Sequence, residues 1–246
     1  MLNIGMNRGI YSSAKAMQTT TQWMDVISNN LANASTDGYK TDTIAFADVL
    51  VKNMYANGGS GKFLGSVGNG PDAVVESTDM KLGPVRSTGN PLDIALQNPK
   101  EMLAINADGK TQYTRDGALK VSPDMFLVTQ RGFQVLDDRG QPIKVGKEGI
   151  VQISPNGEVI QGTQEIAKLG VYTGTFTKEG NNLWSAPQPT RVNDPALATA
   201  SLEGSNVDAV ATMVDLIKIN RHFEMSQKSI HTQDDMTAKL FEILKR

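Results

Sequence analysis

The chain has 246 residues, enough for one large or two modest domains with a buried core. Its 24 lysine and arginine residues nearly balance its 26 aspartate and glutamate residues, so neither a nucleic-acid partner nor a basic membrane anchor is expected. The absence of cysteine excludes disulfides, thiolate metal sites and a thiol nucleophile. Other proteins are therefore the expected partners.

A helix is expected at about residues 7 to 33, where seven residues recur at alternating steps of four and three. They are Ile10, Ala14, Met17, Thr21, Met24, Ser28 and Leu31. Five of the seven are apolar, but Ala, Thr and Ser make the stripe shallow. A helix of this kind is marginal alone in water and needs a partner to pack against.

The stretch NNLANASTDGYK, Asn29 to Lys40, predicts the end of this helix and a turn after it. Its Asn and Ser side chains compete for backbone hydrogen bonds, and Asp37-Gly38 favours a positive φ. Glycine and asparagine then punctuate residues 45 to 70, which predicts a flexible or irregular connector.

Residues 71 to 204 are expected to form an all-β domain. Short apolar runs such as LDIAL, FLVTQ and VQI alternate with turn signals. The turns are predicted at Asp108-Gly109, Asp116-Gly117, Arg139-Gly140, Asn156-Gly157 and Gly180-Asn181. Their spacing favours a sandwich or barrel-like domain over βαβ units.

A second helix is expected from Ser205 to the end of the chain, because Ser205 and Asp208 have the spacing of an N-terminal capping motif. Its seam is predicted at Met213, Leu216, Asn220, Phe223, Gln227, Ile230, Asp234, Thr237, Phe241 and Leu244. The expected class is α+β: the terminal helices (1–44 plus 205–246) pair as a coiled coil, and the residues between them in sequence form a central all-β domain (71–204). Two arrangements remain open: a helix hairpin packed on the β domain, or a coiled coil completed by other copies of the chain.

No catalytic, cofactor or metal site is predicted. GGSGKF departs from a phosphate loop at two positions, and GNGPDA lacks the strand-turn-helix setting of a dinucleotide site. His222 and His231 are nine residues apart, on opposite faces of the second helix. Four polar residues of the β domain could lie close enough together for catalysis, but three of them are in turn sequences, where aspartate is common, so no catalytic site is predicted from them. They are Asp93, Asp108, Arg115 and Asp116.

Both ends of the chain resemble one family. MDVISNNLANASTDGYK and LEGSNVDAVATMVDLIKINRHFEMSQKSI are similar to the paired terminal signatures of bacterial flagellar rod and hook axial proteins. NPLDIALQ and QYTRDGALKVSPDMFLVTQRGFQVL resemble the central domain of the rod members, so the likeness covers nearly the whole chain. LEGSNV followed by RHFEMSQK resembles the proximal rod members most, then the distal rod members, with the much longer hook proteins third.

The resemblance implies a non-enzymatic subunit of the basal-body rod, the hollow drive shaft that crosses the periplasmic space between motor and hook. The implied partners are the chain itself, other rod and hook axial proteins, and the flagellar type III export apparatus. Export by that route uses no cleaved signal, and the N-terminal sequence lacks the apolar core and cleavage site of a secretion signal. Membrane insertion is not expected, because no run approaches 18 apolar residues.

The resemblance also implies roles for individual residues in subunit or helix packing. Residues that would close the first helix and contact adjacent subunits are Asn29, Asn30, Leu31, Ala32 and Asn33. Ser205, Asn206 and Val207 would start the returning helix. Buried helix seams would contain Ile10, Met17, Met24, Leu216, Phe223 and Ile230. Two other functions remain open: a surface adhesin or binding module, and a cell-wall hydrolase, although no spaced pair of carboxylates marks the hydrolase.

Overall fold

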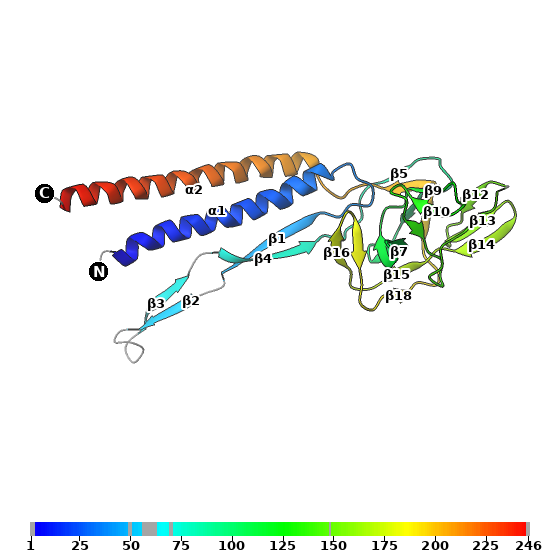
Figure 1. Ribbon diagram of the computed structural model, residues 1–246, viewed down its shortest axis with the longest axis horizontal. Coiled ribbons are helices and arrows are strands. Elements are labelled where there is room, and N and C mark those ends of the chain that lie inside the picture. The colour runs from blue at the N-terminus through cyan, green and yellow to red at the C-terminus, as the bar shows by residue number, and fades with distance from the viewer. Residues whose placement is uncertain (1–2, 49–50, 56–62, 69–70, 148, 245–246) are drawn as a thin grey trace. The chain divides into compact units, whose positions relative to one another are not determined.

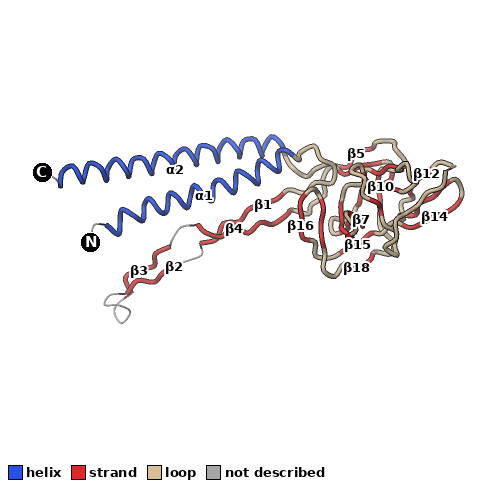
Figure 2. Tube along the Cα trace, in the orientation of Figure 1, coloured by secondary structure: helices blue, strands red, loops and turns tan. Residues whose placement is uncertain are grey.

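The computed structural model describes residues 3–48, 51–55, 63–68, 71–147 and 149–244. The chain divides into two compact units. The first, here the helical unit, comprises Met1–Ala32, Asp42–Thr78 and Asp208–Arg246, and the second, the strand unit, comprises Asn33–Thr41 and Asp79–Val207. Two helices and many antiparallel strands confirm the α+β class (Figure 2).

Two long helices form most of the helical unit. They are α1, Asn3–Ala32, and α2, Ala209–Leu244, and they run side by side in opposite directions (Figure 1). The Oγ atoms of Ser13 on α1 and Ser229 on α2 are 3.5 Å apart. The two predicted helices are thus confirmed.

The inner stripe of α2 follows a strict alternation of four and three residues. Its buried or half-buried members are Thr212, Leu216, Ile219, Phe223, Ser226, Ile230, Gln233 and Thr237. Of the predicted seam, four members lie on this stripe: Leu216, Phe223, Ile230 and Thr237. The prediction was wrong at five members, which are exposed: Met213, Asn220, Gln227, Asp234 and Phe241. Ile219 is fully buried in place of Asn220, and the side chain of Leu244 is outside the described ones. The prediction was wrong at Asn220 because the apolar neighbour loses far more water contact on packing.

Burial on α1 is spread around the helix, because α1 contacts α2 and also strands β1, Asp42–Asp48, and β4, Pro71–Thr78. Thr19, Ile27 and Asn30 are buried, and Met17, Trp23, Met24 and Leu31 are half-buried. The predicted seam positions Ala14, Thr21 and Ser28 are exposed instead. Ile10 lies in α1, but its side chain is outside the described ones.

Strands occupy much of the segment expected to be an irregular connector. β1 pairs with β4, and β2, Val51–Tyr55, pairs with β3, Phe63–Gly68, all antiparallel. Gly65 pairs with Met54 and Gly68 with Val51. These two glycines misled the prediction because a two-stranded ladder is built from backbone hydrogen bonds, which glycine can make. The other connector glycines, Gly58, Gly59, Gly61 and Gly70, lie outside the described residues.

The strand unit is built from antiparallel pairs. Its strands are β5 Val85–Ser87, β6 Ile94–Leu96, β7 Glu101–Ala107, β8 Lys110–Thr114, β9 Leu119–Val121, β10 Leu127–Thr129, β11 Gln134–Val135, β12 Val151–Ile153, β13 Glu158–Gln161, β14 Gln164–Lys168, β15 Val171–Thr173, β16 Thr177–Gly180, β17 Leu183–Ser185, β18 Thr190–Arg191, β19 Leu197–Thr199 and β20 Ser201–Glu203. The largest sheet has the order β16-β17-β8-β7-β11-β10-β9, with β15 joining β7 to β18. Its central strand β7 is almost wholly buried, as expected of a strand covered on both faces.

Candidate assembly sites

The loop of residues 33–41 follows α1 and lies in the strand unit. The backbone N–H of Thr36 donates to the carbonyl of Asn33 (3.1 Å), closing a turn directly after the helix. Gly38 has a φ of +68°, as its sequence predicts, and a Cβ atom there would lie 2.5 Å from the carbonyl carbon of Arg115. Only glycine therefore fits where this loop crosses the chain at Arg115.

A buried triad of charged side chains, Lys40, Arg115 and Glu203, holds this loop. Lys40 Nζ lies 2.6 Å from Glu203 Oε1, and Arg115 donates to Glu203 Oε2 from Nε (2.9 Å) and Nη2 (2.7 Å). All three side chains are at most 1% exposed. The triad joins the 33–41 loop, the segment between β8 and β9, and the end of β20, which are distant in sequence.

The remaining hydrogen-bonding atoms of the triad are also satisfied. Arg115 donates to four carbonyl groups, which belong to Leu96, Asn98, Pro99 and Glu101. Lys40 donates to the carbonyl of Lys81, and Glu203 Oε1 accepts the N–H of Gly83. Charges can be buried at this depth because they are paired and hydrogen-bonded.

Two cations face one carboxylate in the triad. Burial is the main factor that lowers the pKa of Lys40, and the charge of Arg115 lowers it further, whereas the hydrogen bond to Glu203 opposes both. Glu203 is therefore the only negative charge in the triad that stabilises either cation. Sequence reasoning missed this role, and Arg115, considered there for catalysis, has a structural role.

The side chain of Asn206 holds two backbone segments of the strand unit, one at Thr41 and one at Asp79 to Lys81. Its Oδ1 accepts from the N–H (2.8 Å) and the hydroxyl (2.7 Å) of Thr41. Its Nδ2 donates to the carbonyl groups of Asp79 (2.8 Å) and Lys81 (3.2 Å). Thr41 and Asp79 are terminal residues of segments that continue into the helical unit, so this single amide fixes where the chain leaves the strand unit.

The second helix begins later than predicted. Asp208 is its N-cap, because Asp208 Oδ1 accepts the N–H groups of Val210 and Ala211, each at 3.0 Å. Ser205 instead accepts the N–H of Val207 (3.2 Å) within a preceding turn. The assignment of Ser205, Asn206 and Val207 to the helix start was wrong, since their polar groups are engaged in the strand unit.

Asn30 has a related role within the helical unit. Its Nδ2 donates to the carbonyl of Asp42 (2.7 Å), and its Oδ1 accepts the N–H of Asp42 (3.0 Å). This amide is only 4% exposed, so it ties the last turn of α1 to β1. Its neighbours differ in burial: Asn29 is exposed, whereas Leu31 and Asn33 are half-buried.

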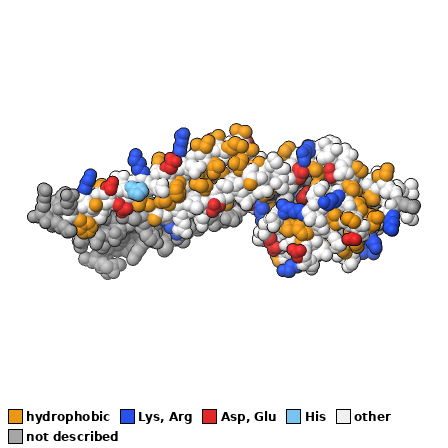
Figure 3. Space-filling view, turned by 45° about the horizontal axis from the view of Figure 1, so that its top comes forward, with side chains coloured by type: hydrophobic (Ala, Val, Ile, Leu, Met, Phe, Trp, Pro, Cys, Tyr) orange, Lys and Arg blue, Asp and Glu red, His pale blue; other side chains and the backbone are white. Residues whose placement is uncertain are grey.

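The start of α2 carries an exposed apolar surface, here the outer patch, formed by Val210, Met213, Val214 and Ile217. These side chains are 73%, 50%, 46% and 55% exposed, and their spacing of three, four and seven residues from Val210 places them on one face of the helix. Figure 3 shows hydrophobic side chains gathered on the surface of the helical unit. Further along the helix, large exposed apolar side chains among those described include Met225, Met236 and Phe241. Exposed apolar residues gathered in this way mark interaction surfaces.

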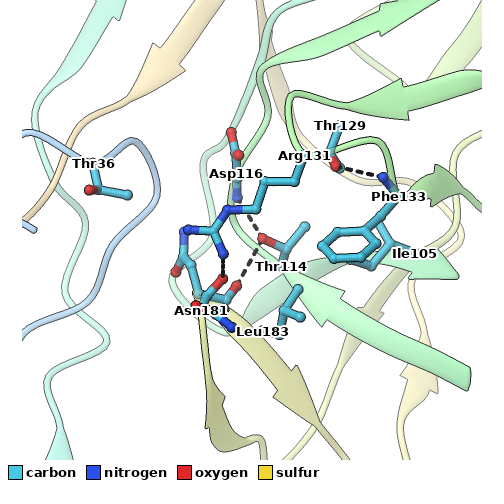
Figure 4. Close-up of a pocket in the computed structure, with 10 residues that line it drawn as sticks. Thr36, Ile105, Thr114, Asp116, Thr129, Arg131, Phe133, Asn181 and Leu183 are labelled. Atoms are coloured by element: carbon cyan, nitrogen blue, oxygen red, sulfur yellow. Dashed lines mark hydrogen bonds between the residues drawn. The ribbon is translucent and has the colours of Figure 1, made fainter. Parts of the chain in front are cut away.

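A small pocket of about 50 Å³ lies in the strand unit. Asp116, Thr114 and Arg131 gather on one side of it, and Ile105 and Phe133 on the other (Figure 4). The residues that complete the lining are Thr36, Thr129, Asn181, Asn182 and Leu183. Burial raises the pKa of Asp116, an effect that the charges of Asp37 and Asp93 reinforce.

Among the described residues, no three His, Cys, Asp or Glu side chains are grouped so that they could hold a metal ion. His222 and His231 are both exposed. In the part of the chain that the structure describes, no helix is long and apolar enough to cross a membrane.

Three family models match successive parts of the chain. Residues 10–40 match "Flagella basal body rod protein", residues 85–161 match "Flagellar hook protein FlgE/F/G D1 domain", and residues 198–243 match "Flagellar basal body rod FlgEFG protein C-terminal". The first match contains the stretch from Asn29 to Lys40, and the last contains both Glu203 and the outer patch.

Individual relatives match over nearly the full length. The chain is 32% identical to the flagellar basal-body rod protein FlgF of Caulobacter vibrioides, covering 97% of this chain and 98% of the relative. It is 30% identical to FlgF of Escherichia coli, covering 97% and 99%. It is also 30% identical to the flagellar basal-body rod protein FlgG of Agrobacterium fabrum, covering 97% and 100%.

Proposed function

Because this chain belongs to the flagellar basal-body rod protein family and is a structural subunit of that rod, we propose that it polymerises through its two long helices into a hollow drive shaft that carries torque from motor to hook. The family is structural, so the chain is not an enzyme. Its place is the basal body of the bacterial flagellum, where it assembles with other axial proteins.

The outer patch is the observation that carries the proposal. Within the described chain these four side chains stay largely in water, although their burial is favourable by roughly 25 cal/mol per Å². Helices from neighbouring subunits would cover them and complete a coiled coil in which α1 and α2 supply the inner seam. A contact between unlike surfaces that does not close produces a helical filament, as a rod requires.

The residues that resemble the family signatures have proposed roles in that assembly. Met17 and Met24 of α1, and Leu216, Phe223 and Ile230 of α2, would form the helix seam within each subunit. Ile10 is proposed for the same seam on the basis of its position alone. Asn29, Leu31 and Asn33 would contact adjacent subunits, while Asn30 and Asn206 hold the backbone beside them.

We further propose that the chain is a proximal rod protein, exported by the flagellar type III apparatus without a cleaved signal and assembled in the periplasmic space. LEGSNV followed by RHFEMSQK supports the proximal assignment. A distal rod protein is the second candidate, because FlgF and FlgG relatives match with similar identity.

The test is a charge in the outer patch. Ile217→Asp should leave the free subunit within about 0.5 kcal/mol of wild-type stability, because the side chain is 55% exposed. It should abolish swimming and remove the chain from purified basal bodies. Asn220→Asp is the matched control, since it adds the same charge at another exposed position of α2. Swimming Ile217→Asp cells with normal amounts of the chain in their basal bodies would contradict the proposal.

A further inference from the structure

The pocket of the strand unit contains hydrogen-bond acceptors that lack donors. Asn182 is 7% exposed, and its Oδ1 accepts no hydrogen bond from the residues that the structure describes. Asp116 accepts one, from the N–H of Ala118 to Oδ1 (3.0 Å), which leaves its Oδ2 without a donor among them. A buried acceptor without a donor is unfavourable, as at Asn182, and the half-buried carboxylate of Asp116 lines the same pocket, so the two residues favour a ligand that donates.

Turn geometry fixes these acceptors in place. Asn181 and Asn182 connect β16 to β17 with φ angles of +53° and +60°, the conformation of a tight hairpin turn. The hydroxyl of Thr114 donates to the carbonyl of Asn182 (3.1 Å) and accepts the N–H of Asp116 (3.1 Å). The backbones of Asn182 and Asp116 are thereby held on either side of one threonine hydroxyl, as Figure 4 shows for Asp116 and Thr114.

The net charge around the pocket favours a positively charged ligand. Asp37 and Asp93 act electrostatically on Asp116, as does Arg131, and Asp37 is paired with Arg86 at 3.0 Å. Three carboxylates and two guanidinium groups leave one net negative charge. Arg131 forms no ion pair with Asp116 and instead donates to the carbonyl of Asn181 (2.6 Å). A single cation would neutralise the site.

We propose that this pocket binds one primary ammonium group, with Asp116 and Asn182 as its acceptors. An ammonium group carries three N–H donors and no acceptor, which matches the unpaired oxygens. A volume of about 50 Å³ admits a group near the size of water, whereas a planar guanidinium is larger. The group belongs either to a small free amine or to a lysine side chain of a second copy of the chain.

The experiment is an NMR titration of the full-length free subunit with ethylammonium chloride, monitoring the backbone amides of Thr114, Asp116 and Asn182. These resonances should shift saturably. Tetramethylammonium chloride has the same charge without N–H groups and should leave them unchanged. Asp116→Asn, which keeps an oxygen for the Ala118 N–H, should weaken ethylammonium binding by about tenfold or more, whereas exposed Asp124→Asn should not.

Equal shifts with both cations, no saturable shift, or undiminished binding by Asp116→Asn would each overturn the inference, and the first two need no variant. Once binding is established, sedimentation velocity separates the two sources. Self-association of the wild type that ethylammonium competes away identifies a lysine of a second copy. A wild type that stays monomeric identifies a free amine. The titration uses the free subunit and does not measure rod assembly, so its failure would not contradict the proposed function.

Discussion

Replacing Glu203 by Gln should destabilise the strand unit strongly, because it removes the only carboxylate of the buried triad. Lys40 and Arg115 would remain buried at no more than 1% exposure without the carboxylate that forms an ion pair with both of them. Removing one partner of a buried pair typically costs about 3–5 kcal/mol. Domains have a total stability of about 5–15 kcal/mol, so the loss would be a large fraction of it.

Lys40→Met should cost less than Glu203→Gln, although both break the same 2.6 Å contact. Its removal leaves one cation and one carboxylate, and Glu203 keeps its bonds from Arg115 and Gly83. Burial lowers the pKa of Lys40, so the loss of this charge also removes an unfavourable burial. The structure thus predicts that both variants are less stable than the wild type and that Glu203→Gln loses more stability than Lys40→Met.

Urea unfolding followed by tryptophan fluorescence measures both effects. Trp184 is 1% exposed in the strand unit, and replacing Trp23 by Phe makes it the only reporter. Glu165→Gln, at an exposed position, is the control and should change stability by less than about 0.5 kcal/mol. A loss below about 1 kcal/mol for Glu203→Gln, or an equal or larger loss for Lys40→Met, would refute the reasoning.

Three further predictions follow from local geometry. Gly38→Ala should lower the free energy of unfolding in urea by about 2 kcal/mol or more, because the residue has a positive φ and an added Cβ would clash with backbone. Gly140→Ala is the control and should lower it less, because its φ is positive but nothing lies within 4 Å of the added Cβ. Equal losses would contradict this. Asp208→Ala should lower the stability of α2 by about 1 kcal/mol in thermal unfolding followed by circular dichroism, because it removes the N-cap. Asp235→Ala, at an exposed position of the same helix, is the control and should not. An equal effect of both variants would contradict the assignment of Asp208 as the N-cap. Burial raises the pKa of Asp116 above its ordinary 3.8, so the folded chain holds this proton more tightly than the unfolded chain. The wild type should therefore lose stability relative to Asp116→Asn as pH rises through the raised pKa, and a difference that does not change between acid and neutral pH would refute this.

Hydrophobic periodicity and turn-forming residues predicted the features that depend on residues close together in the sequence. The two helices, the turn after the first helix and the positive φ of Gly38 each depend on a few neighbouring residues, and the structure confirms them. The helix faces were predicted less well. On α2 the choice between Asn220 and Ile219 depends on which side α1 covers, and on α1 the strands β1 and β4 share the burial.

The buried triad could not be predicted, because its members are 75 or more residues apart in the sequence and each looks like an ordinary surface charge. Lys40 ends a turn-forming stretch, and Glu203 follows a short apolar run. Arg115 precedes Asp116-Gly117, which the sequence predicts as a turn but which forms no turn in the structure. Only the fold brings them together. Asn206 was singled out by resemblance, but its bonds to two distant backbone segments have no local signal in the sequence.

Limited proteolysis of the free subunit and of purified basal bodies tests the central claim most directly, namely that assembly covers the helices. Trypsin sites at exposed Lys218, Arg221 and Lys228 of α2 should be cleaved in the free subunit and protected in basal bodies. Arg139 of the strand unit, also exposed, calibrates trypsin activity on the free subunit. Equal cleavage of the three α2 sites in both samples would contradict the account.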